Sequence, residues 1–385
     1  MAKFIKKVLP PILSSLIGIA VALLIGELII RLFYPQVTSP VQFFYDEKLG
    51  GVVPVPNQKG FKKFPDVYYY EYQNNNIGMR DKRNVADYQK YANRILCIGD
   101  SFTYGWGVND DETFSRILEK KINKDSIAVL NAGTSGVGTD YVLKFLQVRG
   151  QELKPNSVIY FYFDNDMTDN MANAYFHIEN DSIIGNDKNS VTRGNALKKN
   201  KLINNSLYNF LSSYSQLFGL VRYNLGVIWN KRVEEENRKN SAIAEKTKSL
   251  APAVSNAAPS AAKQPVATPV ASINKQDSLY HTYKYLSAAK KEAEKLGAQF
   301  LMFYIPSHIS LQELQQSGKI GVEQSLKKYC EENRIDFYSF AGQVARAKNP
   351  IEAYYLPVDY HWNKDGHALA GNYIYEVLKQ KGIVP

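Results

Sequence analysis

Four short polar blocks in this sequence carry the residue types that acyl transfer requires. They are "IGDSFTYG" around Ser101, "LNAGTSGVGTD" around Gly136, "FYFDNDMTDN" around Asn165 and "DYHWNKDGHALAG" around His361. A serine hydroxyl is a weak nucleophile that needs an adjacent base, and His361 is a candidate for that base. Asp359, two residues before His361, could orient the imidazole and stabilise the imidazolium that forms. The blocks therefore predict a Ser–His–Asp triad.

The same blocks contain candidate donors for the negative charge that develops on a carbonyl oxygen. The backbone N–H groups of Ser101 and Gly136 and the side-chain amide of Asn165 could form an oxyanion hole. Losing one such donor typically costs about 2.7–4 kcal/mol of transition-state stabilisation. Because functional groups of an open parallel sheet collect beyond the carboxyl ends of its strands, we expect these distant blocks to converge.

Alternating strand and helix patterns are predicted to position the blocks. Apolar runs predict strands at 94–98, 127–130, 157–163, 299–305 and 335–339. Helical patterns lie at about 112–122, 139–150, 279–296, 320–333 and 365–380. Strands that alternate with helices indicate a parallel sheet covered on both faces.

In type and order, the four blocks resemble those of the SGNH/GDSL hydrolase family. That family folds as a flavodoxin-like three-layer α/β/α sandwich around a parallel sheet. The resemblance implies that Ser101 is the nucleophile and that Asp359 and His361 complete the triad. It also implies that Gly136 and Asn165 donate to the oxyanion together with the Ser101 backbone.

The sequence departs from the family pattern in two places. One residue separates Asp359 from His361, whereas two are usual in the family. The shorter spacing is similar to a branch that contains membrane-associated polysaccharide O-acetylation proteins. The family's third block usually reads Gly-x-Asn-Asp, but here Phe163 and Asp164 precede Asn165. We therefore expect the triad to be kept and the oxyanion loop to be shaped differently.

These residues also have simpler structural alternatives. Ser101 could cap a helix, which is the commonest role of a serine at such a boundary, and Asn165 could be a turn residue. Ser135 is a rival nucleophile, but Val137 stands where a Gly-x-Ser-x-Gly elbow requires glycine. Asp100 is expected to be a structural hydrogen-bonding partner. The presence of all four blocks favours the catalytic role for Ser101.

The N-terminal residues 1–34 predict a cytoplasmic tip and one transmembrane helix. Residues 8–30 are apolar except for Glu27, and about 20 such residues suffice to cross a hydrocarbon core. A cleaved signal peptide has a shorter apolar core and a small-residue cleavage site. Lysines precede the span and few basic residues follow it directly, which predicts a cytoplasmic N-terminus. The catalytic domain would then be periplasmic or extracellular, held at the cell (inner) membrane.

Beyond the anchor, the sequence predicts three further parts. Residues 35–90 read as a lead-in that bears strands. Residues 91–180 and 279–385 form the catalytic domain, and the family resemblance covers nearly the same ranges, about half of the chain. Residues 181–278 interrupt it, with an amphipathic helix near 207–229 and a linker rich in Ala, Pro and Ser that is too polar to form a core.

Composition and spacing argue against several other classes of protein. The net charge is +10, but the sequence has no recognisable nucleic-acid-binding module. Asp164, Asp166 and Asp169 lack the glycine and the distal glutamate of a calcium loop. "GTSGVG" lacks the order of a phosphate-binding loop. Cys97 and Cys330 are too few for a disulfide framework. We therefore expect no nucleic-acid partner, no metal and no cofactor.

The sequence predicts a membrane-anchored serine esterase that cleaves ester groups, in particular O-acetyl groups on a cell-surface glycan. Small esters are an alternative substrate. The same triad could instead serve an O-acyltransferase that acetylates a polysaccharide with a membrane-bound acyl-donor partner. A third alternative is a non-catalytic glycan-binding or assembly protein, which would have no physical need for the triad.

Overall fold

The computed structural model describes the chain except for residues 1, 187–196, 201, 203–204, 226 and 229–274. It has two compact units. The anchor unit consists of Met1–Gln36 and Ser215–Asn274, and the α/β unit consists of Val37–Tyr214 and Lys275–Pro385. The predicted Ala/Pro/Ser-rich linker lies almost entirely outside the described residues.

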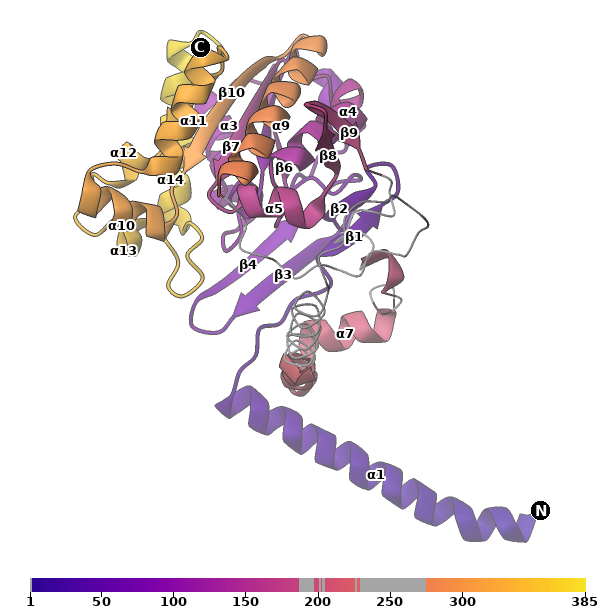
Figure 1. Cartoon of the computed structure of the whole chain (residues 1–385). Coiled ribbons are helices and arrows are strands. Elements are labelled where there is room, and N and C mark those ends of the chain that lie inside the picture. The colour runs from indigo at the N-terminus through magenta and orange to yellow at the C-terminus, as the bar shows by residue number, and fades with distance from the viewer. Residues whose placement is uncertain (1, 187–196, 201, 203–204, 226, 229–274) are drawn as a thin grey trace, which may run out of the picture. The chain divides into compact units, whose positions relative to one another are not determined.

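A five-stranded parallel sheet forms the centre of the α/β unit (Figure 1). Its strands are β5 (Asn93–Gly99), β6 (Ile127–Gly133), β7 (Ser157–Phe163), β10 (Gln299–Ile305) and β11 (Asp336–Ser339). Their spatial order is β11-β10-β7-β5-β6. Counted along the chain this is the order 2-1-3-4-5 of flavodoxin-like folds, whose ligand crevice lies between the first and third strands. The predicted fold class is therefore confirmed, and β5 and β7 are the first and third strands of this order.

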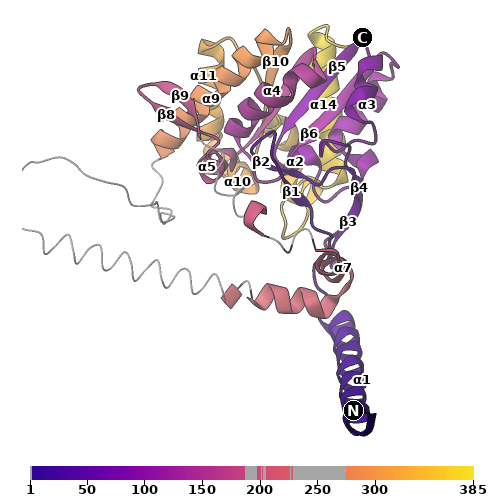
Figure 2. The same cartoon turned by 90° about the vertical axis from the view of Figure 1, so that its right-hand side faces the viewer.

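Helices cover both faces of this sheet, as Figure 2 shows. One face packs against α4 (Thr139–Leu153), α9 (Lys275–Lys295) and α11 (Gly321–Glu332), and the other against α3 (Phe114–Ile122) and α14 (Lys364–Gln380). Alternate residues of one strand point to opposite layers. In β5, Leu96 and Ile98 join the first core, whereas Ile95 and Cys97 join the second.

The strands and helices predicted from the apolar pattern are confirmed to within a few residues at their ends. Shorter elements connect them. They are η1 (Val85–Lys90), α2 (Ser101–Tyr104), η2 (Asp110–Glu112), α5 (Asp166–Asn173), β8 (Phe176–Glu179), β9 (Ser182–Gly185), α7 (Ser206–Tyr214), α10 (His308–Ser317), α12 (Ala341–Val344) and α13 (Pro350–Tyr354).

The lead-in forms two antiparallel hairpins that belong to the α/β unit. β1 (Phe43–Asp46) pairs with β2 (Gly51–Pro54), and β3 (Lys59–Phe64) pairs with β4 (Tyr68–Gln73). In β4 the side chains alternate between buried and exposed, as a strand with one covered face requires. Its buried tyrosines pack against Tyr104 and Leu356, which belong to segments flanking two of the predicted site residues.

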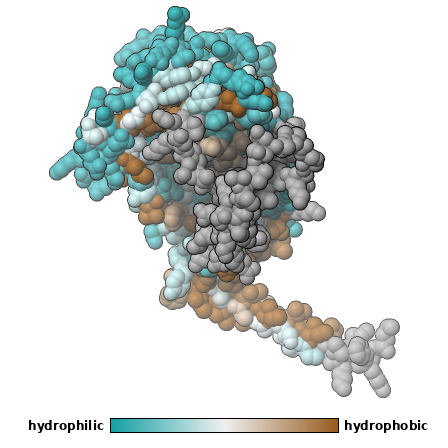
Figure 3. Space-filling view, viewed as in Figure 1, coloured by the Kyte–Doolittle hydropathy of each residue, from teal (hydrophilic) through white to brown (hydrophobic). Residues whose placement is uncertain are grey.

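In the anchor unit, α1 (Ala2–Phe33) contains the apolar stretch Leu9–Phe33. This stretch is long and apolar enough to cross a membrane, although a signal sequence would have the same pattern. Figure 3 shows apolar side chains exposed along the helix. The Glu27 carboxylate accepts hydrogen bonds from the Ser215 hydroxyl at 2.8 Å and from the backbone N–H of Gln216 at 2.9 Å.

The region near 207–229, predicted as one amphipathic helix, contains two helical segments, α7 and residues 216–225. Ser215 lies between them, and its hydroxyl accepts a hydrogen bond from the Phe218 N–H at 3.1 Å. A serine that caps a helix in this way begins a new segment. Glu27 satisfies further N–H groups of that first turn, which explains why the helix restarts here.

Candidate active site

Ser101 is separated from the end of β5 by Asp100 alone and is the first residue of the short helix α2. Asp100, not Ser101, caps this helix, because the Asp100 Oδ1 accepts a hydrogen bond from the Phe102 N–H at 2.9 Å. Gly105, with a φ of 88°, ends the helix after one turn. The Ser101 side chain is therefore not used as the cap, and its hydroxyl is available for another partner.

That partner is His361, which lies 260 residues away in the sequence. The Ser101 Oγ is 2.7 Å from the His361 Nε2, and the His361 Nδ1 bonds to the Asp359 Oδ1. A carboxylate accepts only, so the Nδ1 carries the proton and the Nε2 is free to accept the serine proton. The His361 side chain is 22% exposed, so part of the imidazole is open to solvent, whereas Ser101 is buried.

A tight loop after α13 holds Asp359 and His361 side by side. The Leu356 N–H donates to the His361 carbonyl at 2.7 Å and closes the loop. Val358 and Tyr360 have φ values of 66° and 60°, a left-handed backbone that is costly for these side chains. This backbone lets residues only two apart face one another, which accommodates the short Asp-x-His spacing.

Sheet topology brings the other two predicted blocks to the same rim. β5 lies between β6 and β7, and Gly99 at its end pairs with Gly133 of β6 and with Phe161 of β7. The loop with Gly136 follows β6, and Asn165 follows β7. All three segments therefore leave the sheet at its carboxyl edge, next to one another.

The glycines near these loops permit close packing. A Cβ on Gly133 would lie 2.0 Å from the Tyr104 backbone nitrogen, so α2 rests directly on the end of β6. A Cβ on Gly138 would lie 2.4 Å from the Asp166 carbonyl oxygen, so the loop after β6 also touches α5. The blocks around Ser101, Gly136 and Asn165 are thus packed against one another.

Gly136 and Asn165, two of the three predicted oxyanion donors, occupy defined positions. Gly136 has a φ of 70°, and its carbonyl accepts a hydrogen bond from the Asn173 Nδ2 at 2.9 Å. Asn165 precedes α5, but its side chain makes no capping hydrogen bond. The Asn165 Oδ1 is buried and has no hydrogen-bond partner among the described residues. Both residues therefore lie in loops at the carboxyl edge of the sheet. The Asn165 side-chain oxygen does not make the turn hydrogen bond that was the structural alternative for this residue.

Three residues of the site were not identified from the sequence: Lys62, Tyr68 and Trp106. The Tyr68 hydroxyl accepts a hydrogen bond from the Trp106 Nε1 at 3.1 Å and lies 3.5 Å from the Asp359 Oδ2. The Lys62 Nζ lies 3.4 Å from the centre of the Trp106 ring. The only sequence signal was the alternation of tyrosines in β4, which does not reveal what they touch.

Electrostatics keep Asp359 ionised. Burial acts to raise its pKa, but the hydrogen bond and charge of His361, together with the charge of Lys62, outweigh burial. The pKa of Asp359 therefore lies below its ordinary value. A charged carboxylate at neutral pH is the form that stabilises an imidazolium.

Further carboxylates stand next to the predicted site residues in the sequence, with Asp100 before Ser101 and Asp164 and Asp166 on either side of Asn165. Burial, with a smaller effect from Asp169, raises the pKa of Asp100 to about 7. Burial and the charge of Asp100 also raise the pKa of Asp166 well above its ordinary value. The Tyr304 hydroxyl donates a hydrogen bond to the Asp164 Oδ1 at 2.6 Å. Among the described residues, no group of three or more His, Cys, Asp or Glu side chains is placed to hold a metal ion.

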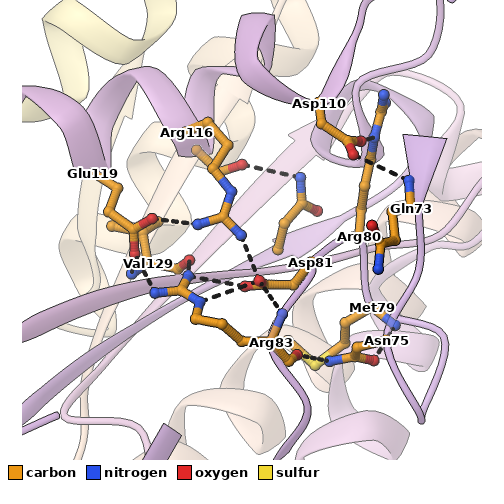
Figure 4. Close-up of polar contacts among 12 residues, drawn as sticks. Gln73, Asn75, Met79, Arg80, Asp81, Arg83, Asp110, Arg116, Glu119 and Val129 are labelled. Carbon is orange, nitrogen blue, oxygen red and sulfur yellow. Dashed lines mark hydrogen bonds and ion pairs between the residues drawn. The ribbon is translucent and has the colours of Figure 1, made fainter. Parts of the chain in front are cut away.

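Buried charges fix the segment that follows α2 (Figure 4). The Arg80 guanidinium donates to the Asp110 carboxylate at 2.8 Å and to the carbonyl oxygens of Tyr104 at 3.1 Å and Val108 at 2.7 Å. It also donates to the Glu71 carbonyl of β4 at 3.1 Å. Arg80 thereby joins the hairpin that carries Tyr68 to the segment that carries Trp106.

A neighbouring ion-pair network completes this region. In Figure 4, Arg83 and Arg116 both point at the buried Asp81, at 2.9 and 2.6 Å. Arg83 also pairs with Glu119 of α3 at 2.9 Å. Each guanidinium thus has a carboxylate partner, as buried charges require.

No protein-family model matches the sequence, and no curated protein matches it. Solved structures are similar to it at low identity. The psychrotrophic esterase EstA from Pseudoalteromonas sp. is 13% identical with a TM-score of 0.37, over 75% of this chain and 98% of that chain. A member of the lipolytic protein G-D-S-L family from Veillonella parvula is 13% identical with a TM-score of 0.36, over 75% and 100%. A two-domain esterase active on acetylated mannans is 11% identical with a TM-score of 0.38, over 77% and 51%.

No activity is carried over from these structures to this chain. The chemistry of the site rests instead on its own geometry, a hydroxyl, an imidazole and a carboxylate joined in series at the carboxyl edge of a parallel sheet.

Proposed function

We propose that this chain is a serine esterase in which Ser101, His361 and Asp359 act as the catalytic triad. The observation that carries the proposal is the 2.7 Å contact between the Ser101 Oγ and the His361 Nε2, with Asp359 bonded to the other ring nitrogen. A hydroxyl placed against a base that is itself oriented by a carboxylate is the arrangement of an activated nucleophile.

The reaction follows from these contacts. The Ser101 Oγ attacks the ester carbonyl carbon while the His361 Nε2 takes the hydroxyl proton, and Asp359 stabilises the imidazolium. The carbonyl oxygen becomes an oxyanion, for which the N–H groups of Ser101 and Gly136 and the Asn165 amide are the proposed donors. Collapse of the intermediate breaks the ester C–O bond, and the leaving alcohol takes the proton from His361. Water, deprotonated by His361, then cleaves the acyl-enzyme and regenerates Ser101.

We further propose that α1 anchors the enzyme in a membrane, with the α/β unit outside the cytoplasm. The apolar stretch Leu9–Phe33 and the lysines at positions 3, 6 and 7 support this orientation. An O-acetylated cell-surface glycan is the proposed substrate. It is supported by the anchor and by the resemblance of the Asp-x-His spacing to that of polysaccharide O-acetylation proteins.

The test uses the full chain in detergent, compared with the variants Ser101→Ala and Ser135→Ala. A fluorophosphonate should label the parent protein and Ser135→Ala but not Ser101→Ala. The parent should release acetate from an activated acetyl ester and from an acetylated glycan. Equal labelling and equal acetate release by Ser101→Ala and the parent would refute the proposal.

The same experiment separates the other two functions. With an acetyl donor and a bare oligosaccharide present, transfer of acetyl to the sugar would identify an acyltransferase that uses the same triad. Binding of glycan with no labelling at Ser101 and no turnover would identify a non-catalytic protein.

A further inference from the structure

The lead-in hairpin contributes directly to the surroundings of the triad. We infer that Tyr68, on β4, is a positioning residue that holds the second oxygen of Asp359. This inference rests on the proposed esterase function and assigns to the hairpin a part in it. Tyr68 would act on the reaction only through Asp359 and His361, without touching the substrate.

The two carboxylate oxygens of Asp359 have different neighbours. The Oδ1 bonds to the His361 Nδ1, and the Oδ2 faces the Tyr68 hydroxyl at 3.5 Å. A carboxylate held at one oxygen alone can rotate about its Cβ–Cγ bond. A donor at the Oδ2 restricts that rotation and so keeps the Oδ1 aligned with the imidazole.

Trp106 determines where the Tyr68 proton points. An indole N–H can only donate, and the Trp106 Nε1 donates to the Tyr68 oxygen at 3.1 Å. The tyrosine oxygen is therefore the acceptor in that bond, and its own proton is directed to another acceptor. The Asp359 Oδ2 is the acceptor that the structure places in reach.

The surroundings hold this chain of contacts in place. Tyr68 is only 9% exposed, and its ring packs edge-on against Phe64, with centroids 5.7 Å apart. The Lys62 Nζ lies over the Trp106 ring, a cation–π contact that helps to hold the indole. Burial and the charge of Asp359 raise the pKa of Tyr68, so its hydroxyl stays protonated and remains a donor.

Charged and titratable groups face Asp359 from each element packed against it. Lys62 comes from β3, Tyr68 from β4 and His361 from the loop of Asp359 itself. Removing the Tyr68 hydroxyl leaves Lys62 and His361 in place and takes one hydrogen-bond donor from the Asp359 carboxylate. The less satisfied carboxylate then holds a protonated imidazole more tightly, so the inactive protonated form persists to a higher pH.

The test compares Tyr68→Phe with Tyr69→Phe in the full chain. Both changes remove one tyrosine hydroxyl from β4. Tyr69 points to the opposite, exposed side, where its hydroxyl bonds to Glu71 at 2.8 Å. We expect Tyr68→Phe to lower kcat about 3- to 10-fold at unchanged KM. The acidic limb of its pH–rate profile should move up by about 0.3–0.5 pH unit. Tyr69→Phe should match the parent in both respects.

Trp106→Phe provides a second, independent variant, since it keeps an aromatic ring but removes the N–H that orients Tyr68. If the two residues act in series, the double variant should lose no more kcat than Tyr68→Phe alone. If the kcat loss of the double variant equals the product of the two single losses, Tyr68 is merely structural. The same conclusion follows if Tyr68→Phe lowers kcat without moving the acidic limb of the pH–rate profile. If Ser101→Ala abolishes turnover while Tyr68→Phe behaves as the parent, this inference is wrong and the esterase proposal stands. If Ser101→Ala retains turnover, the esterase proposal itself fails.

Discussion

The backbone of Tyr104 lies so close to Gly133 that a Cβ on the glycine would be 2.0 Å from the Tyr104 nitrogen. The contact joins the helix that begins with Ser101 to the end of the neighbouring strand. The position of Ser101, the proposed nucleophile, therefore depends on a glycine that has no proposed part in the chemistry.

Gly133→Ala should accordingly displace α2. We expect the free energy of unfolding to fall by about 1–3 kcal/mol, because the overlap is with backbone and cannot be relieved by a rotamer change. Urea unfolding and the rate of fluorophosphonate labelling measure the two effects. Gly185→Ala is the matched control, since nothing lies within 4 Å of a Cβ there. Equal stability of the two variants would contradict the contact.

Asp359→Asn should lower kcat by about 10⁴-fold, the loss seen when a triad aspartate becomes an amide that stabilises the wrong imidazole tautomer. The fold should be unaffected, because the two side chains have almost the same shape. Steady-state kinetics on an activated acetyl ester provide the measurement. Asp365→Asn, at an exposed position in the first turn of α14, is the control. A loss of less than tenfold for Asp359→Asn would argue against its role in the triad.

The free energy of unfolding should fall as the pH rises from the ordinary pKa of an aspartate to the raised pKa of Asp100 in the folded protein. Burial raises its pKa from 3.8 to about 7, so between these values the folded state holds a proton that the unfolded chain has lost. The free energy of unfolding then decreases with rising pH, because the folded state binds more protons. Asp100→Asn keeps an acceptor for the Phe102 N–H and removes this ionisation.

The variant should therefore be more stable relative to the parent at pH 8 than at pH 5, as measured by urea unfolding at both values. Asp125→Asn, at an exposed position, should show no such difference. A parent–variant difference that is independent of pH would show that Asp100 is ionised in the folded protein at both values.

Val358→Asn should stabilise the protein. Val358 has a φ of 66°, which is unfavourable for a β-branched residue and tolerated by asparagine. Its side chain is 71% exposed, so little apolar burial is lost. We expect a gain of about 1 kcal/mol in the free energy of unfolding, with kcat unchanged. Thermal unfolding and steady-state kinetics test both parts, and a lower melting temperature would contradict the strained backbone.

Much of the fold could be predicted because it depends on local patterns. The apolar run at 94–98 predicts β5, since successive side chains of a strand enter the two opposite cores. Ser101 and His361 could be proposed as partners because each stands in a short block of recognisable composition. The sequence predicts that the two side chains meet, but only the structure gives the distance of 2.7 Å between the Ser101 Oγ and the His361 Nε2.

Contacts between segments far apart in the chain could not be predicted, because they leave no pattern in the local sequence. Tyr68 and Asp359 are 291 residues apart and meet through one hydroxyl. A row of alternating tyrosines indicates a half-buried strand but not what lies opposite it. The restart of the helix at Ser215 depends on Glu27, which is 188 residues earlier. Such a partner cannot be inferred from the sequence around Ser215.

If α1 anchors the chain as proposed, the hydrogen bonds between Glu27 and residues 215–217 have a consequence for release of the α/β unit from the membrane. Three peptide links join the α/β unit to the anchor unit: one after Gln36, one before Ser215 and one after Asn274. A protease that cut the chain just after α1 would sever only the first link, because Glu27 would still hold α1 to the segment that begins at Ser215. Release of the α/β unit would then require either loss of the Glu27 hydrogen bonds or cuts at both ends of the segment 215–274.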